Sequence, residues 1–235
     1  SKEINHPKGT ILNKRMVKAL EKSKFIIANS NFTKNLAIKL GVNENKIKVI
    51  NPGCNYPIEV QKEYKKQAEE IYNGAFPKII TIARLEKRKN HEKVLMNIKN
   101  LKFKFPKIKY ICIGDGDEKE NLIELRDELG LQNNVIFIHK SEEQLKAALL
   151  QESNLFLMPS IVYKKSVEGF GISFIEAAGF GKGSIGGKDG GEADAIKENQ
   201  TGFLCDGNDF NSIYEKIINF FENDKYILFG KNAYE

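Results

Sequence analysis

Two basic side chains, Arg84 and Lys89, have types and a spacing that suit a diphosphate. Both follow an apolar run at 78–83. An arginine offers a planar fork of N–H groups to an oxyanion and a lysine offers a compact charge. The alternative is a surface loop that happens to be basic, and this stretch by itself leaves both interpretations open.

A second group of candidate residues is framed by Glu168 and Glu176, which are separated by seven residues. Gly169 and Gly171 permit unusual backbone angles and the close approach of a ligand. A helix predicted from Ile172 onward leaves the N–H groups of its first turn free for an anion. The two carboxylates can then accept hydrogen bonds from hydroxyl groups on either side of a bound diphosphate. The alternative is a loop acid at 168 and a solvated helix residue at 176.

A third stretch, Gly114-Asp115-Gly116, follows the apolar run at 108–113. It resembles half of a glycine-rich phosphate loop but lacks the full GxGxxG pattern of dinucleotide-binding proteins. We favour a tight turn into the next helix over a phosphate site.

The elements that carry these candidates follow from the sequence pattern, in which short apolar runs alternate with amphipathic stretches. The alternation predicts an α/β fold with a Rossmann-like parallel sheet and helices on both faces. Ligands of such sheets bind outside the carboxyl ends of the strands, where all three stretches lie. The expected strands are 78–83, 108–113, 135–138, 154–158, 184–185 and 203–204, and the expected helices are 90–104, 118–129, 142–150, 172–180, 192–198 and 210–221.

The first part of the chain forms a separate unit in the sequence pattern. Its expected helices are 10–22 and 32–40, with Ser30 or Asn31 as the N-cap of the second. Its expected strands are 25–28 and 46–50, and 59–72 has a helical period with a weak apolar face. We therefore divide the chain into a first unit at 1–52, a connection at 53–77 and an α/β unit at 78–235.

The composition is that of a folded globular protein. The 235 residues include 37 Lys plus Arg and 31 Asp plus Glu, a difference of +6, and 41% are hydrophobic. Disorder requires low hydrophobicity with high net charge, and no apolar run approaches the roughly 20 residues of a membrane helix. The cysteines and histidines show no metal-ligand spacing, and the cysteines indicate a reducing, cytoplasmic setting.

The positive charge is concentrated in lysine-rich stretches such as 62–66, 87–89 and 99–109. They are either solvated helix faces or attract anionic phosphates on a small ligand, a membrane surface or a nucleic acid. We expect no nucleic-acid partner, because the chain has no basic motif interleaved with aromatic residues.

At these residues the sequence resembles the retaining nucleotide-sugar glycosyltransferases of family 4 (group 1), whose GT-B fold has two facing Rossmann-like domains. The resemblance rests on the E-x7-E pair Glu168 and Glu176 and on the pair Arg84 and Lys89. It runs from about residue 10 to the end of the chain and is similar in detail to the phosphatidylinositol mannosyltransferase-like branch. The further matching stretches are 28–33, 49–53, 113–116, 135–139, 186–192 and 201–204.

The resemblance implies a metal-independent, retaining hexosyltransferase. Its donor would be a UDP- or GDP-linked sugar, and its acceptor a glycan or a lipid-linked molecule in polysaccharide or lipopolysaccharide biosynthesis. It implies that Arg84 and Lys89 hold the diphosphate, Glu168 binds hydroxyls of the transferred sugar and Glu176 binds the ribose. The other implied donor contacts are the backbone amides of Gly171, Ile172 and Ser173 and a base pocket at 138–140 that includes His139 and Lys140. No cofactor is implied besides the nucleotide sugar as co-substrate.

The resemblance also implies that this chain is the nucleotide-sugar-binding, C-terminal portion of the fold. We expect 78–235 to bind the donor and 1–52 to be the remainder of an N-terminal, acceptor-side domain. This portion is expected to be inactive in sugar transfer by itself. Asn90, where the family often has glycine, and Gly183, where it often has proline, depart from the pattern without touching the proposed chemistry.

Two other functions stay open on the sequence alone. One is a non-catalytic nucleotide-sugar-binding module, and the other is a sucrose- or glycogen-synthase-like glucosyltransferase domain. The expected location is cytoplasmic, with peripheral contact to an anionic membrane surface as a further alternative.

Overall fold

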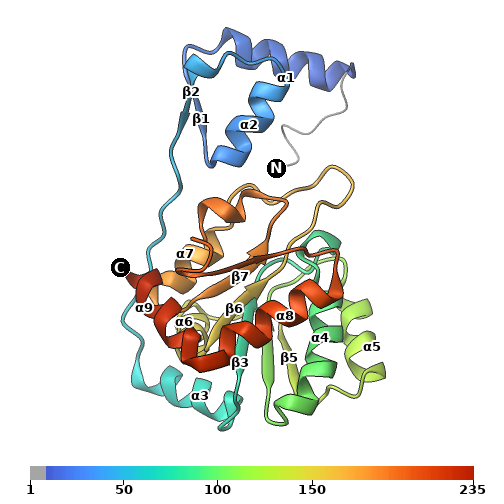
Figure 1. The fold of residues 1–235 in the computed structure, drawn as a ribbon, viewed down its shortest axis with the longest axis vertical. Coiled ribbons are helices and arrows are strands. Elements are labelled where there is room, and N and C mark those ends of the chain that lie inside the picture. Colours follow the sequence, from blue (N-terminus) through green and yellow to red (C-terminus); the bar gives the residue numbers. More distant parts are fainter. Residues whose placement is uncertain (1–8) are drawn as a thin grey trace.

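The computed structural model describes residues 9–235. Its centre is a six-stranded sheet in which all neighbouring strands are parallel, in the order β5-β4-β3-β6-β7-β8 (Figure 1). The strands are β3 (Lys78–Ile82), β4 (Lys109–Ile113), β5 (Val135–Ile138), β6 (Leu155–Met158), β7 (Ser184–Gly187) and β8 (Gly202–Cys205). The expected α/β fold with a Rossmann-like parallel sheet is confirmed.

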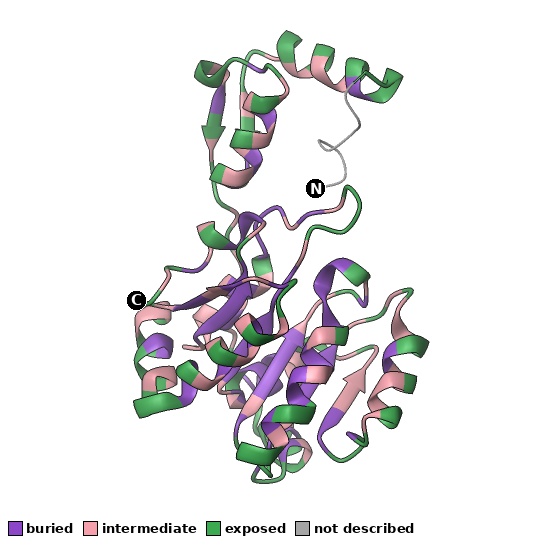
Figure 2. Ribbon diagram, turned by 45° about the vertical axis from the view of Figure 1, so that its right-hand side comes forward, coloured by how far each residue is buried: buried purple, intermediate pink, exposed green. Residues whose placement is uncertain are grey.

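Helices cover both faces of the sheet. Successive residues of each strand point to opposite faces, so both faces carry apolar side chains that need cover. Ile79 of β3 packs in one core layer and Ile80 in the other, and the strands other than the edge strand β5 are buried over most of their length (Figure 2). One layer contains α4 (His91–Lys104), α5 (Lys119–Glu128), α8 (Phe210–Phe221) and α9 (Lys225–Tyr234), and the other contains α3 (Lys62–Tyr72), α6 (Glu143–Glu152) and α7 (Ile172–Gly179).

The N-terminal part is a smaller layer of its own. It consists of α1 (Ile11–Lys22), β1 (Ile26–Ala28), α2 (Asn31–Lys39) and β2 (Ile47–Val49), and β1 pairs with β2 in parallel. Of the two expected N-caps, Ser30 is the one found, since its hydroxyl accepts a hydrogen bond from the Thr33 N–H at 2.9 Å. The division at 52 and 77 stays a prediction about domains, and residues 1–8 of its first unit lie outside the described chain.

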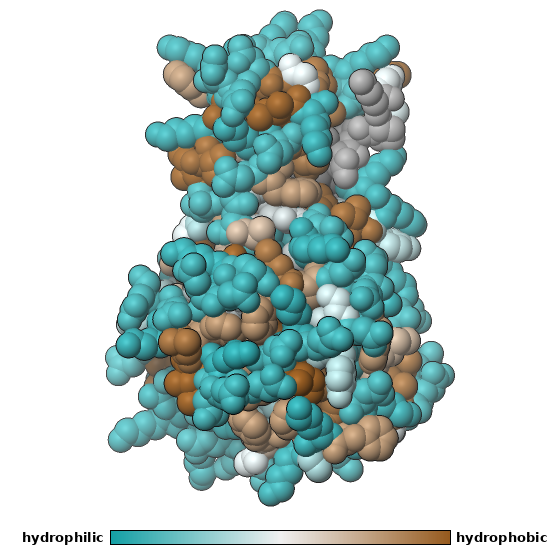
Figure 3. All heavy atoms as spheres, in the orientation of Figure 1, coloured by the Kyte–Doolittle hydropathy of each residue, from teal (hydrophilic) through white to brown (hydrophobic). Residues whose placement is uncertain are grey.

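The two-stranded sheet leaves large apolar side chains in solvent. Phe25 is 73% exposed and Ile27 is 69% exposed, and apolar side chains lie among polar ones at the top of Figure 3. Parallel sheets are normally covered on both faces. The N-terminal part therefore has an incompletely covered sheet.

Direct contacts join the N-terminal part to the larger domain. The backbone N–H and the side-chain amide of Asn31 donate to Asp194 at 2.7 and 2.8 Å. The Thr33 hydroxyl donates to the carbonyl of Gly169 at 3.4 Å. These bonds hold the start of α2 against the loops that follow β6 and β7.

The expected helix at 192–198 is wrong. The chain instead makes a short 3₁₀ turn, η3 (Gly191–Asp194), whose two ends are held by tertiary hydrogen bonds: the Gly191 N–H donates to the Glu168 carbonyl at 2.9 Å, and Asp194 accepts from the Asn31 N–H. Helix α9 was not expected. Three further 3₁₀ turns are η1 (Glu44–Lys46), η2 (Lys87–Lys89) and η4 (Glu222–Asp224).

All three cysteines, Cys54, Cys112 and Cys205, are free thiols. Within residues 9–235, no helix combines the length and the hydrophobicity needed to cross a membrane. The same residues contain no group of three or more His, Cys, Asp or Glu side chains arranged to hold a metal ion.

Candidate functional site

The order of the strands creates a crevice between β3 and β6. After β3 the chain moves outward to β4, whereas after β6 it moves outward on the other side to β7. Ligands of open α/β sheets bind at such a switch point, outside the carboxyl ends of the strands. The loops that follow β3 and β6 are therefore the two that can reach a ligand from both sides.

A pocket of about 420 Å³ lies at these two loops. Six of the predicted site residues line it: Arg84, Lys89, Glu168, Gly171, Ile172 and Ser173. The other lining residues are Asn29, Pro52, Arg88, Ser166, Val167, Gly169 and Phe170. The structure thus brings together stretches that are about 80 residues apart in the sequence.

Helix α7 points its N-terminus into the pocket wall. Its N-cap, Gly171, has a φ of 89°, and a Cβ at this position would lie 2.6 Å from the Phe174 ring, so the turn requires glycine. The Ser173 hydroxyl donates to the carbonyl of Ile82 at 3.0 Å and ties the first turn of α7 to the end of β3. The N–H groups of this first turn and the helix dipole favour an anion.

A compact cluster of charges lies beside this helix end. Glu168 accepts hydrogen bonds from Lys89 and, at 2.8 Å, from Arg88. Burial alone would raise the pKa of Glu168, but the charges of Lys89 and Arg88 outweigh it and lower the pKa to about 2. Glu168 is therefore an ionised carboxylate held by two cations.

Arg84 is the exposed member of the cationic set. Its side chain is 67% exposed, and its Nη1 lies 2.7 Å from Glu86 Oε1. Lys89 is almost fully buried, and burial lowers its pKa even though Glu168 favours the charged form. A buried cation with part of its charge unneutralised attracts an incoming anion strongly, because little water screens it.

Glu192 is a buried acid that sequence reasoning missed, because it was placed at the start of a helix. It is 0% exposed, and neither carboxyl oxygen has a hydrogen-bond partner among residues 9–235. Burial, reinforced by the charge of Glu168, raises the pKa of Glu192 to about 8. Its carboxyl group therefore holds a proton at neutral pH.

The remaining predicted residues do not line the pocket. Glu176 lies one turn further into α7, where its Oε1 is 4.0 Å from Lys146 Nζ, and burial raises its pKa. His139 and Lys140 follow β5; the Nδ1 of His139 is buried and has no partner in the described chain, and Lys140 is exposed. Their roles in binding a ribose and a base stay predictions.

The stretch 114–116 is a tight turn and is not part of the pocket lining. Gly114 has a φ of 152°, and a Cβ there would lie 1.9 Å from the Ala83 carbonyl oxygen. The N–H of Leu85 donates to the carbonyl of Asp115 at 3.0 Å. The turn therefore supports the backbone from which Arg84 projects.

Known proteins match this chain over most of its length. Residues 61–235, which are 175 of the 235, match the family described as "Glycosyl transferases group 1". A GDP-mannose-dependent alpha-(1-6)-phosphatidylinositol monomannoside mannosyltransferase of Mycolicibacterium smegmatis is 26% identical over 142 residues, which cover 60% of this chain and 37% of the relative. An alpha-1,3/1,6-mannosyltransferase of Dictyostelium discoideum is 36% identical over 105 residues, which cover 43% of this chain and 24% of the relative.

The fold also matches solved structures. The complex of Anabaena HepE with UDP and glucose has a TM-score of 0.83 at 20% identity, covering 99% of this chain and 64% of that one. At this identity the likeness concerns the fold. The chain spans less than half of the length of the curated relatives it matches.

Replacing Glu192 by glutamine (Glu192→Gln) should flatten the pH dependence of stability between the two pKa values of this acid, 4.5 and about 8. In that range the folded carboxyl keeps its proton and the unfolded one loses it, so unfolding releases a proton. The free energy of unfolding of the wild type then falls as the pH rises, by up to about 1.4 kcal/mol per pH unit. The variant lacks this contribution.

Urea unfolding of both proteins across this range measures the difference. His91 contributes equally to both, so its own pKa, which burial lowers to about 4, cancels in the comparison. Glu124→Gln, at an exposed position on α5, serves as the control and should follow the wild type. Parallel curves for the wild type and Glu192→Gln would contradict the prediction.

Proposed function

The chain belongs to the group 1 glycosyl transferases, and from that premise we propose that its larger domain binds a nucleotide-diphosphate sugar for transfer to an acceptor hydroxyl. The proposed donor is UDP- or GDP-linked. Two names support this choice: a mycobacterial relative is GDP-mannose-dependent, and the Anabaena neighbour is a complex with UDP and glucose.

The observation that carries the proposal is the convergence of three cations on the N-terminus of α7. Arg84, Arg88 and Lys89 line the same pocket as Ile172 and Ser173. The acids among these contacts, Glu86 and Glu168, leave the cations in excess, 3 − 2 = +1. A diphosphate supplies the missing negative charge, and its oxygens accept hydrogen bonds from the N–H groups of the helix end.

In the proposed reaction the acceptor hydroxyl oxygen forms a bond to the anomeric carbon. The bond from that carbon to the diphosphate oxygen breaks, its electron pair leaves with the nucleoside diphosphate, and the hydroxyl proton is released. Negative charge grows on the diphosphate during this step. Arg84 and Lys89 are the proposed groups that stabilise it, with Lys89 as the buried cation of the two. This contribution is the basis for proposing metal independence.

Glu168 suits binding rather than proton transfer. A carboxylate with a pKa of about 2 is a weak base at neutral pH, whereas an effective general base has a pKa near the working pH. We assign it to hydroxyls of the transferred sugar, and we assign Glu176 to the ribose. Retention of the anomeric configuration is proposed from the resemblance to family 4.

The proposed acceptor is a glycan or a lipid-linked molecule. The mycobacterial relative, by its name, acts on a phosphatidylinositol monomannoside. A cytoplasmic location, with contact between the lysine-rich surface and anionic lipid, is part of the same proposal. The net charge of +6 supports such contact.

We expect a nucleotide sugar to raise the melting temperature of the chain. Ligand at 100 times its Kd stabilises the folded state by about 2.7 kcal/mol. Calorimetry with UDP-glucose and GDP-mannose then measures affinity, and Arg84→Ala and Lys89→Ala should each weaken it about ten-fold or more, as expected for a charge-assisted hydrogen bond. Arg126→Ala is the control, since Arg126 pairs with Asp127 on α5. The absence of any shift with UDP-, GDP- and ADP-linked ligands would exclude the donor site.

The two glutamates should affect different parts of the ligand. Glu176→Ala should lower the affinity for the nucleoside diphosphate and for the nucleotide sugar alike, because both ligands carry the ribose. Glu168→Ala should weaken binding of the nucleotide sugar only, since the free nucleoside diphosphate lacks the sugar hydroxyls that Glu168 is proposed to bind. Calorimetry on both ligands decides, and equal losses for Glu168→Ala would reject its sugar role.

We expect residues 1–235 to bind the donor without transferring its sugar at the rates usual for enzymes. Transfer requires the acceptor hydroxyl to be held against the anomeric carbon, and such positioning contributes roughly 7–11 kcal/mol. The incompletely covered sheet at β1 and β2, with exposed Phe25 and Ile27, supports the view that the acceptor side is only partly present. A radiolabelled donor distinguishes transfer from slow hydrolysis, and transfer above about one per second would contradict this expectation.

A further inference from the structure

The ammonium group of Lys89 has two partners among the described residues, although it carries three N–H donors. Its Nζ contacts Glu168 and lies 3.1 Å from the Met158 sulfur. If the proposed function holds, a bound diphosphate competes with Glu168 for the same ammonium. The orientation of Glu168 then depends on its other partners, which are the Gly169 N–H, 3.1 Å from Oε1, and Arg88.

Arg88 is the charged one of these two partners. Its Nη1 lies 2.8 Å from Glu168 Oε2, and the residue is only 8% exposed. Its Nη2 is 3.8 Å from Glu86 Oε2, and its carbonyl accepts the Ile161 N–H at 2.9 Å. Arg88 is therefore held both by the ion pairs of its guanidinium and by the hydrogen bond of its backbone carbonyl.

The two cations differ in what they can do when a ligand arrives. Glu86 links Arg88 to Arg84, since its two oxygens face one arginine each. The planar guanidinium of Arg88 spans two carboxylates, with Nη1 on Glu168 and Nη2 toward Glu86, whereas an ammonium can turn toward a new anion. Arg88 is thus suited to stay on Glu168 while Lys89 turns to phosphate.

We propose that Arg88 is a positioning residue that keeps Glu168 directed at the transferred sugar when the diphosphate binds Lys89. The inference rests on the proposed function and adds a residue that lies between the two members of the Arg84 and Lys89 pair. Arg88 acts through Glu168, so its removal affects recognition of the sugar more than recognition of the nucleoside diphosphate.

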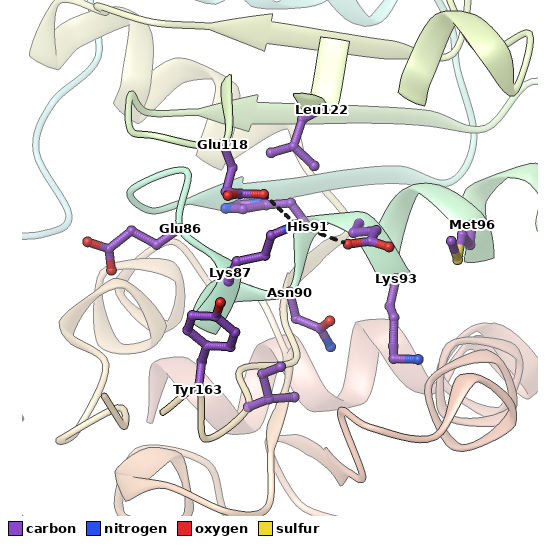
Figure 4. A pocket seen from close by; sticks show the side chains of 11 residues that line it. Glu86, Lys87, Asn90, His91, Lys93, Met96, Glu118, Leu122 and Tyr163 are labelled. Carbon is purple, nitrogen blue, oxygen red and sulfur yellow. Dashed lines mark ion pairs between the residues drawn. The ribbon is translucent and has the colours of Figure 1, made fainter. Parts of the chain in front are cut away.

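The chain offers a matched control in the neighbouring cation. Lys87 belongs to the same 3₁₀ turn but faces away, into a second pocket of about 210 Å³ (Figure 4). There it lies 2.7 Å from Glu118 and 3.5 Å from Glu92. Lys87→Met removes the same charge as Arg88→Met, one residue away, without touching Glu168.

Calorimetry on the wild type, Arg88→Met, Arg88→Lys and Lys87→Met tests the proposal, with UDP and UDP-glucose or with GDP and GDP-mannose, whichever pair the wild type binds. We expect Arg88→Met to weaken both ligands, since both lose one positive charge of the pocket, and to cost the nucleotide sugar about ten-fold more affinity than the nucleoside diphosphate. Arg88→Lys should recover part of the lost affinity. The affinity of Lys87→Met for both ligands should stay within about two-fold of the wild type.

Combining Arg88→Met with Glu168→Gln completes the test. The added loss from Arg88→Met should be small in the Glu168→Gln background, because the two residues act as one unit. Equal losses on both ligands, no loss, or full additivity would overturn the proposal. If Arg88→Met does not fold, Arg88→Lys decides, since it should still show a larger loss on the nucleotide sugar. A wild type that binds none of the four ligands would instead contradict the proposed function.

Discussion

The structure of this site depends on one partly buried carboxylate that two cations share. Glu168 lies at the end of the loop after β6, and Lys89 and Arg88 lie in the turn after β3. These strands are neighbours at the point where the chain reverses its direction across the sheet. Without the carboxylate, two buried cations would face each other at a cost of several kcal/mol. The ion cluster therefore fixes the distance between the loops and leaves a net positive site for an anion.

Much of the fold follows from the sequence pattern. The central strands are apolar on both sides because helices cover both faces, so runs such as 78–82 and 109–113 stand out from the amphipathic helices between them. The pattern fails where backbone contacts decide the structure. The sequence around Glu192 predicts the start of a helix, but tertiary hydrogen bonds at Gly191 and Asp194 hold this segment as a short turn.

The candidate site was predictable where a residue type and its chemistry coincide, as at Arg84, Lys89 and the start of α7. It was not predictable which members of the basic run 87–89 face the pocket. A 3₁₀ turn has three residues per turn, so the direction of each side chain depends on where the turn begins. Lys87 points to Glu118, whereas Arg88 and Lys89 point to Glu168. Only tertiary contacts distinguish three cations that are alike in sequence.

The pocket is also where the N-terminal part meets the larger domain. Asn29 and Pro52 form part of its wall, and Thr33 donates to the carbonyl of Gly169, directly beside Glu168. A ligand that fills the pocket touches residues from both parts, so its binding free energy adds to the few hydrogen bonds that hold them together. The loop between β6 and α7 thus has two tasks, because its backbone holds α2 while its carboxylate holds the cations. Any change at Glu168 that shifts this loop should alter both the anion site and the contact between the two parts of the chain.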